Sequence, residues 1–205
     1  MVQMFIYDHV YALVKIFGFS QKYIYNEKIK PVKSCDKIKL KIKSYSENMR
    51  FLDPDIPAVF LHVDGIETVE KDGSRANEIE ARVIKKIVST LKEQGITSER
   101  IGIITPYRAQ RRLLKETLKD ETIEINTVDA FQGREKDVII FSITSTEDLS
   151  FVEDENRLNV AFTRARKKLI VIGNIRSIET HGKDLLPKFV SYIKQINGLY
   201  YWSSS

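Results

Sequence analysis

The chain has 205 residues, of which 42% are hydrophobic and 30% charged, and its formal net charge is +5 with a pI near 9.1. This composition is ordinary for a soluble globular protein, and the mild basic excess is compatible with a nucleic-acid partner without being diagnostic of one. Cys35 is the only cysteine, which excludes an internal disulfide and a zinc site built from cysteines. A single thiol fits a reducing, cytoplasmic setting.

No stretch approaches the ~20 consecutive apolar residues that a membrane span needs. No basic leader precedes an apolar core, so we expect neither a signal peptide nor membrane contact. The length allows one large domain, or one domain with an appendage.

Residues 1–57 are predicted to form an N-terminal helix and a lysine-rich linker or ribbon that belong to the same domain as the rest. Tyr7 to Phe19 has the pattern of an amphipathic helix. Lys28 to Lys43 is lysine-rich and partly alternating, which favours a half-exposed strand or ribbon. Its basic face could lie along a nucleic-acid backbone, or it could be a charged edge that resists aggregation. Asp53 to Pro57 indicates a linker.

From residue 58 to residue 205, apolar strands and amphipathic helices alternate. We predict strands over 58–63, 101–104, 123–128, 138–142 and 169–172. We predict helices over 77–94, 105–118, 156–165 and 185–196. Strands that are apolar on both faces, separated by amphipathic helices, indicate a mostly parallel sheet covered on both sides, which is an α/β three-layer sandwich.

Local signals support these boundaries. Asn77 followed three residues later by Glu80 resembles a capping box at a helix start, and Pro106 suits the first position of the next helix. His62 lies inside an apolar strand and is expected to be a hydrogen-bonded core residue rather than a ligand.

Three polar clusters follow predicted strands: residues 105–110, residues 127–137 and the helix over 156–165. Ligands of open parallel sheets meet the loops at the carboxyl ends of the strands, so we expect all three clusters to converge on that edge. In the second cluster, Gly133 would let the backbone approach a ligand closely. The amide, cation and carboxylate around it suit the ribose and phosphates of a nucleotide.

In the third cluster, Leu158, Phe162 and Ala165 form an apolar stripe at helical spacing. Arg157 and Arg164 lie on a neighbouring stripe. Arginine grips phosphate well because its charge is permanent and its donors form a planar fork. Ordinary surface arginines on a solvated face are the alternative.

The sequences Val-Asp-Ala-Phe-Gln-Gly-Arg-Glu-Lys-Asp (128–137) and Arg-Leu-Asn-Val-Ala-Phe-Thr-Arg-Ala-Arg (157–166) resemble motifs V and VI of superfamily 1 helicases, and the 105–110 cluster resembles motif IV. The most similar group contains the nonsense-mediated-decay RNA helicase and the nuclease-helicases that process Okazaki flaps. A further signature, Ser74, Asn77, Glu80 and Ala81, precedes motif IV. The resemblance covers roughly residues 19–197.

This resemblance implies a RecA-like domain of the P-loop NTPase type, the second (C-terminal) RecA-like domain of a two-domain motor. By the same likeness, Arg164 is the arginine finger that meets the γ-phosphate of ATP, and Arg157 supports that site. Glu135 would accept a hydrogen bond from the ribose, and Gln132 with Gly133 would line the phosphate side.

The resemblance also assigns Thr105, Tyr107 and Thr127 to the nucleic-acid strand, where hydroxyls bind phosphate oxygens and an aromatic ring stacks on a base. For Thr105 an N-cap role at the following helix is an equally good interpretation.

The chain departs from the family in lacking a Gly-x-x-x-x-Gly-Lys-Ser/Thr motif and the Asp-Glu motif that holds magnesium. His181 to Asp184 imitates the former poorly. ATP and Mg²⁺ would therefore be held mainly by an N-terminal RecA-like domain carrying Walker A and B. We expect the chain alone to be inactive as an ATPase and, as part of a helicase, to act 5′ to 3′ on DNA more than RNA. The alternative is a freestanding, non-catalytic module that binds nucleic acid or protein.

Overall fold

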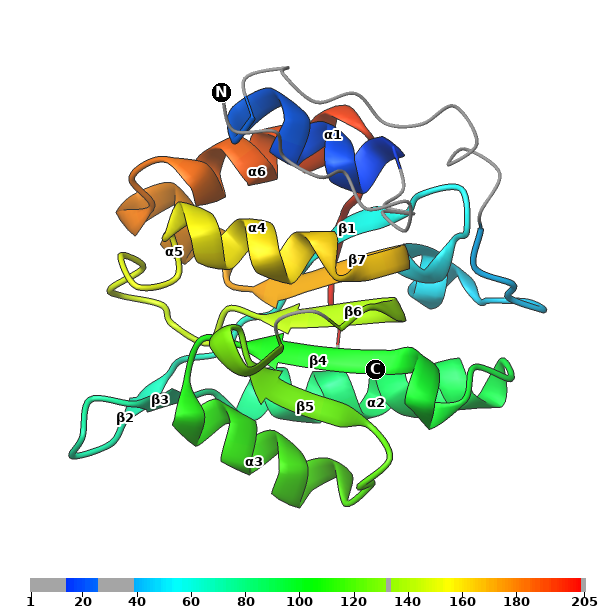
Figure 1. The fold of residues 1–205 in the computed structure, drawn as a ribbon, viewed down its shortest axis with the longest axis horizontal. Coiled ribbons are helices and arrows are strands. Elements are labelled where there is room, and N and C mark those ends of the chain that lie inside the picture. Colours follow the sequence, from blue (N-terminus) through cyan, green and yellow to red (C-terminus); the bar gives the residue numbers. More distant parts are fainter. Residues whose placement is uncertain (1–13, 26–38, 132–133, 204–205) are drawn as a thin grey trace, which may run out of the picture.

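A six-stranded sheet forms the centre of the computed structural model, which describes residues 14–25, 39–131 and 134–203 (Figure 1). Its strands lie in the order β5-β4-β6-β7-β1-β8, and every pairing between neighbours is parallel. Their bounds are β1 Ala58–His62, β4 Ile101–Thr105, β5 Glu124–Thr127, β6 Lys136–Ser142, β7 Ala165–Gly173 and β8 Leu199–Tyr201.

Helices cover both faces of this sheet. One face carries α1 (Val14–Tyr23), α4 (Glu155–Thr163), α5 (Ile175–His181) and α6 (Leu185–Gln195). The other carries α2 (Glu78–Glu93) and α3 (Arg108–Leu118), with the short 3-10 turns η2 (Glu47–Leu52) and η3 (Ser98–Arg100). In Figure 1, α4 lies in front of the strands and α2 behind them. The expected three-layer, RecA-like α/β fold is confirmed.

Two hydrophobic cores, one on each face, hold these layers together. The strands β1, β4 and β7 are buried along nearly their whole length, as their unbroken apolar runs predict. On the α4 face, Phe19 of α1 packs edge-to-face against Phe162 and Phe189, with ring centroids 6.0 and 5.1 Å away. On the opposite face, the apolar stripe of α2 packs on the sheet.

Several boundaries differ from expectation. Helix α3 begins at Arg108 rather than at Pro106, because Thr105 ends β4 and Tyr107 is still in extended conformation. Residues 39–43 form no strand, although Leu40 is buried and Lys41 and Lys43 are exposed as the alternation predicts. The expected helix over 7–19 lies partly outside the described residues, and its described part belongs to α1.

The sequence patterns also left three elements unassigned: α5, strand β8 in the aromatic tail, and a hairpin of β2 (Thr68–Val69) and β3 (Arg75–Ala76). His62 is buried as expected, and its Nδ1 accepts the Ile175 N–H at 3.1 Å. Burial lowers its pKa.

The described residues between β5 and β6 form no α-helix, and the connection runs from one edge of the sheet to the other. It leaves the carboxyl end of β5 at Thr127, forms the 3-10 turn η4 (Asp129–Phe131) and enters the amino end of β6 at Lys136. Phe131 is fully buried against β4, and a Cβ added at Gly102 would lie 2.7 Å from its ring. The absent side chain of Gly102 thus lets the crossover lie close on the sheet.

Candidate functional site: two edges of one sheet

The three polar clusters do not share one edge, and this corrects the sequence-based expectation. Thr105 and Thr127 end β4 and β5 at the carboxyl edge, but Glu135 precedes β6 at the amino edge. Helix α4 runs back across the sheet, so that Arg164, directly before β7, also lies at the amino edge. The physical reason is that the chain must return from the carboxyl edge to the amino edge before the next parallel strand begins, so the end of each connection lies at the amino edge.

Arg164 and the crossover from β5 to β6 are immediate neighbours. The backbone N–H of Lys136 donates to the Arg164 carbonyl at 3.0 Å. Phe131 in the crossover and Phe162 of α4 belong to the same core, so both segments lie on one side of the sheet. Glu135 directly precedes Lys136, whereas Gln132 and Gly133 lie outside the described residues.

The Arg164 side chain is half-buried and oriented by its own helix. Its Nε donates to the Val160 carbonyl at 3.1 Å, which fixes the plane of the guanidinium. Within the described residues, no carboxylate forms an ion pair with it. Other cations at this edge are paired: Arg100 and Lys167 both contact the Asp137 carboxylate, at 2.5 and 3.2 Å. The terminal donors of Arg164 therefore have no carboxylate partner among the described residues.

A buried lysine that the sequence patterns did not single out lies nearby. Lys168 in β7 is fully enclosed, and its Nζ donates to the carbonyls of Asp53 and Ile56 at 2.9 and 2.5 Å. Burial lowers its pKa to about 7. The Asp53–Pro57 linker is thereby fastened to the amino half of β7.

Arg157 lies at the other end of α4, about 10 Å from Arg164 along the helix axis given seven residues of rise. Its guanidinium carbon lies 4.2 Å from the ring centroid of Phe151, and its NH1 lies 3.9 Å from the Asp154 carboxylate. Asp154 also caps the helix by accepting the Arg157 N–H at 2.9 Å. The structure thus separates the two arginines that the resemblance assigns to one phosphate site.

Thr105 does not face solvent. Its hydroxyl lies 3.2 Å from that of Thr144 and accepts the Tyr107 N–H at 3.3 Å, inside a fully buried polar network. The position of Thr105 fits neither interpretation. Its side chain is buried, so it does not face a bound nucleic-acid strand. The N-cap position of α3 is occupied by Tyr107. Tyr107 itself is 7% exposed, and burial raises its pKa.

The buried network joins α2, α3 and β6. Gln110 accepts the Asn77 N–H at 2.8 Å and donates to the Ser142 hydroxyl at 3.0 Å. Asn77 caps α2 as predicted by accepting the Glu80 N–H. In a capping box, the Glu80 carboxylate would also accept the Asn77 N–H. Here it accepts the Ser142 hydroxyl and the Thr144 N–H instead.

Glu80 is fully buried within this network. Burial raises the pKa of its carboxyl to about 8, because the charged form loses its hydration there, while the hydrogen bonds from Ser142 and Thr144 oppose that rise. Burial thus favours the protonated form of this carboxyl. The signature residues Asn77 and Glu80, together with Gln110 of the 105–110 cluster, thus build the support under the carboxyl edge.

Thr127, by contrast, lines an open groove of about 550 Å³ between α3 and the β5–η4 segment. We call it the α3 groove. Four cations at the helical spacing i, i+3, i+4 and i+7 line it: Arg108, Arg111, Arg112 and Lys115. The other lining residues are Glu116, Asn126, Thr127 and Ala130. The spacing of the cations is a readable signal which the sequence analysis missed.

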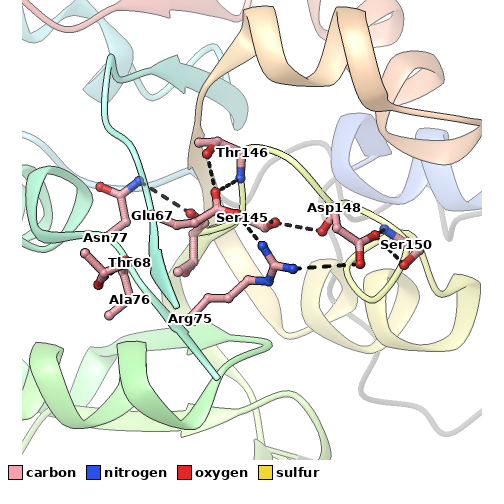
Figure 2. A network of polar contacts seen from close by, with 10 residues as sticks. Glu67, Thr68, Arg75, Ala76, Asn77, Ser145, Thr146, Asp148 and Ser150 are labelled. Atoms are coloured by element: carbon pink, nitrogen blue, oxygen red, sulfur yellow. Dashed lines mark hydrogen bonds and ion pairs between the residues drawn. The ribbon is translucent and has the colours of Figure 1, made fainter. Parts of the chain in front are cut away.

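A hairpin is clamped to the same edge (Figure 2). The Glu67 side chain is 4% exposed and binds Arg75 across the hairpin and both the N–H and the hydroxyl of Thr146. Arg75 also reaches toward Asp148, at 3.8 Å. Asp148 in turn accepts the N–H of Ser150 at 3.1 Å. The loop between β6 and α4 is therefore tied to β2 and β3.

No group of three or more His, Cys, Asp or Glu side chains in the described parts of the chain could bind a metal ion. The part of the chain that the structure describes also contains no helix with the length and apolar character of a membrane span.

Comparison with known proteins agrees with this architecture. A family model described as an AAA domain matches residues 12–176. An uncharacterized ATP-dependent helicase of Methanocaldococcus jannaschii is 41% identical over 167 residues, covering 78% of this chain and 25% of the relative. The Caenorhabditis elegans regulator of nonsense transcripts 1 is 38% identical, covering 72% and 15%. The mouse DNA replication ATP-dependent helicase/nuclease is 40% identical, covering 62% and 13%.

The chain spans a quarter or less of the length of these relatives. Its matched segment includes the β5–β6 crossover, α4 and most of the sheet. The chain belongs to this AAA-domain family and is a superfamily 1 helicase domain.

Proposed function

We propose that the chain is the C-terminal motor domain of an ATP-dependent helicase and that its amino edge completes a nucleotide site held mainly by another domain. The observation that carries this proposal is the state of Arg164. Its guanidinium is oriented by Val160, partly exposed, and without a carboxylate partner among the described residues. A domain that only binds nucleic acid has no use for such a group beside the Glu135 segment.

In this role, Arg164 stabilises the charge that develops on the γ-phosphoryl group during transfer, which in related phosphoryl-transfer enzymes is worth about 10³ to 10⁵ in rate. The planar fork suits this task because two donors can contact two phosphate oxygens at once. Glu135 would bind the ribose, and Gln132 with Gly133 the phosphate side. Mg²⁺ would be held by the other domain, because the described residues provide no ligand cluster for it.

At the carboxyl edge, we propose that the α3 groove binds the backbone of single-stranded nucleic acid. Arg108, Arg111, Arg112 and Lys115 would neutralise phosphates, and Thr127 would add a hydroxyl. Arg112 also pairs with Glu70, at 2.5 Å, so the groove cations are not equally available. This assignment replaces Thr105 and Tyr107, whose side chains are enclosed.

Motor action follows from having the two sites at opposite edges of one rigid sheet. Closure of the partner domain on ATP at the amino edge would move the whole sheet, and with it the strand held at the carboxyl edge. By family likeness the direction is 5′ to 3′, with DNA the preferred strand. A freestanding, non-catalytic binding module remains the alternative function.

The test is reconstitution in a chimera. The chain replaces the corresponding segment of the Methanocaldococcus jannaschii helicase, and ATP hydrolysis is measured with and without single-stranded DNA or RNA. We expect no turnover from the 205-residue chain alone and strand-stimulated turnover from the chimera. Turnover by the chain alone would contradict the split site. A folded chimera that binds the strand but hydrolyses no ATP would favour the non-catalytic module.

A further inference from the structure

Phe151 is a large apolar side chain that the fold leaves exposed at the carboxyl edge. It lies in the loop between β6 and α4, and 42% of its surface is accessible. One exposed phenylalanine on a globular protein requires no explanation by itself. The contacts that hold this ring, and the charges around it, are what point to a ligand.

The ring has a fixed orientation. The Arg157 guanidinium lies over it at 4.2 Å from the centroid, and the Tyr107 ring lies 5.5 Å away at an interplanar angle of 37°. Arg157 is itself held by Asp154 at the start of α4. An aromatic side chain held in this way loses little conformational entropy when a flat ligand stacks on it.

The backbone that carries Phe151 is fixed as well. The residue before it, Ser150, donates its N–H and its hydroxyl to Asp148, at 3.1 and 2.6 Å. Asp148 lies beside Arg75, which the buried Glu67 carboxylate binds from the other side (Figure 2). An exposed loop that served only as a connection would not need this clamp.

The ring is connected to the phosphate-binding surface proposed above through one residue. Tyr107, which contacts Phe151, immediately precedes Arg108, and Arg108 lines the α3 groove. Proteins bind single strands by combining a positive groove with aromatic rings, since every base offers a π-face for stacking.

We propose that Phe151 stacks on a base of the bound single strand and that Arg157 positions its ring, rather than contacting the nucleotide phosphate. This inference rests on the proposed binding of single-stranded nucleic acid. The contact is independent of base identity and of charge neutralisation. It therefore contributes to affinity without contributing to the salt dependence of binding.

The experiment is a fluorescence titration of the 205-residue chain with a labelled oligothymidylate at two salt concentrations. Base stacking is worth enough that Phe151→Ala should weaken binding by roughly 5- to 150-fold with an unchanged salt slope. Phe151→Trp should retain most of the affinity. Arg108→Ala provides the contrast, because losing a phosphate contact lowers the slope by about 1. Tyr201→Ala removes another exposed aromatic and should change nothing.

A second oligonucleotide isolates the base. On an abasic strand of the same length, the wild-type chain and Phe151→Ala should bind equally. Equal binding of both proteins to the normal strand, with unchanged thermal melting, overturns the inference and favours a protein partner for Phe151. An equal loss on normal and abasic strands also overturns it, since the effect would not involve stacking. If the wild-type chain binds neither strand, the nucleic-acid half of the proposed function fails together with this inference.

Discussion

The polar side chains at the two edges of the sheet are arranged differently. At the amino edge, the carboxylate of Asp137 is shared by Arg100 and Lys167, and Arg164 is left with no carboxylate among the described residues. At the carboxyl edge, Asn77, Gln110 and Ser142 are bonded to one another beneath the surface, and the exposed groups come from α3 and from the loop before α4. A shared motif therefore contains both residues that meet a ligand and residues that shape the surface.

The carboxyl edge would be disrupted most by removing the centre of its buried network. Gln110→Leu leaves the buried Asn77 N–H without its acceptor and removes one hydrogen bond each from the Asn77 carbonyl and the Ser142 hydroxyl. The carbonyl keeps the Ala81 N–H and the hydroxyl keeps the Glu80 carboxyl, so one group becomes unsatisfied. Because a buried unsatisfied group costs about 1–3 kcal/mol, we expect the free energy of unfolding to fall by that amount. Urea denaturation of the 205-residue chain measures this directly.

Gln195→Leu is the matched control, since Gln195 is an exposed glutamine at the end of α6. Its effect should stay within about 0.5 kcal/mol. A loss of similar size in both variants would mean that the network under the carboxyl edge contributes no special stability.

A smaller effect concerns pH and the same network. Glu80 has a pKa of about 8 in the folded chain against 4.5 as its ordinary value, so the folded state holds one more proton between these values. The contribution of Glu80 to the free energy of unfolding should therefore fall as pH rises from about 4.5 to about 8. Glu80→Gln imitates the protonated carboxyl and should make stability less dependent on pH between 5 and 7, compared with the wild-type chain.

Glu78→Gln removes an exposed carboxylate from the same helix and should leave the wild-type pH dependence in place. The difference between the two variants isolates Glu80 from His62 and Lys168, whose lowered pKa values act in the opposite direction over part of this range. Identical pH profiles for Glu80→Gln and the wild-type chain would refute the buried, protonated carboxyl.

The sequence predicted the sheet and most helices because their apolar runs are long and their caps are local. Asn77 is such a cap, and its role depends on residues three positions away. The error over the edge that Glu135 and Arg164 occupy comes from grouping both with the loops that follow strands, although each directly precedes a strand and therefore lies at the amino edge of a parallel sheet. The burial of Thr105 and the exposure of Phe151 depend on packing between segments distant in the chain.

The roles of the two α4 arginines differ in the same way. Motif spacing places Arg157 and Arg164 on one helical stripe, and that much is visible in the sequence. The structure adds that seven residues of helix put them at opposite edges, one over Phe151 and one beside β6. The direction of α4 across the sheet is what places Arg157 beside the Phe151 ring and Arg164 at the proposed nucleotide site.

The most direct test of this division compares Arg164→Ala with Arg157→Ala in the helicase chimera, measuring ATP turnover at saturating single strand and strand affinity separately. We expect Arg164→Ala to lower turnover by about 10³-fold or more with little change in strand affinity. We expect Arg157→Ala mainly to weaken strand binding. Equal losses of turnover at saturating strand in both variants, or full turnover in Arg164→Ala, would show that the two arginines do not have these separate roles.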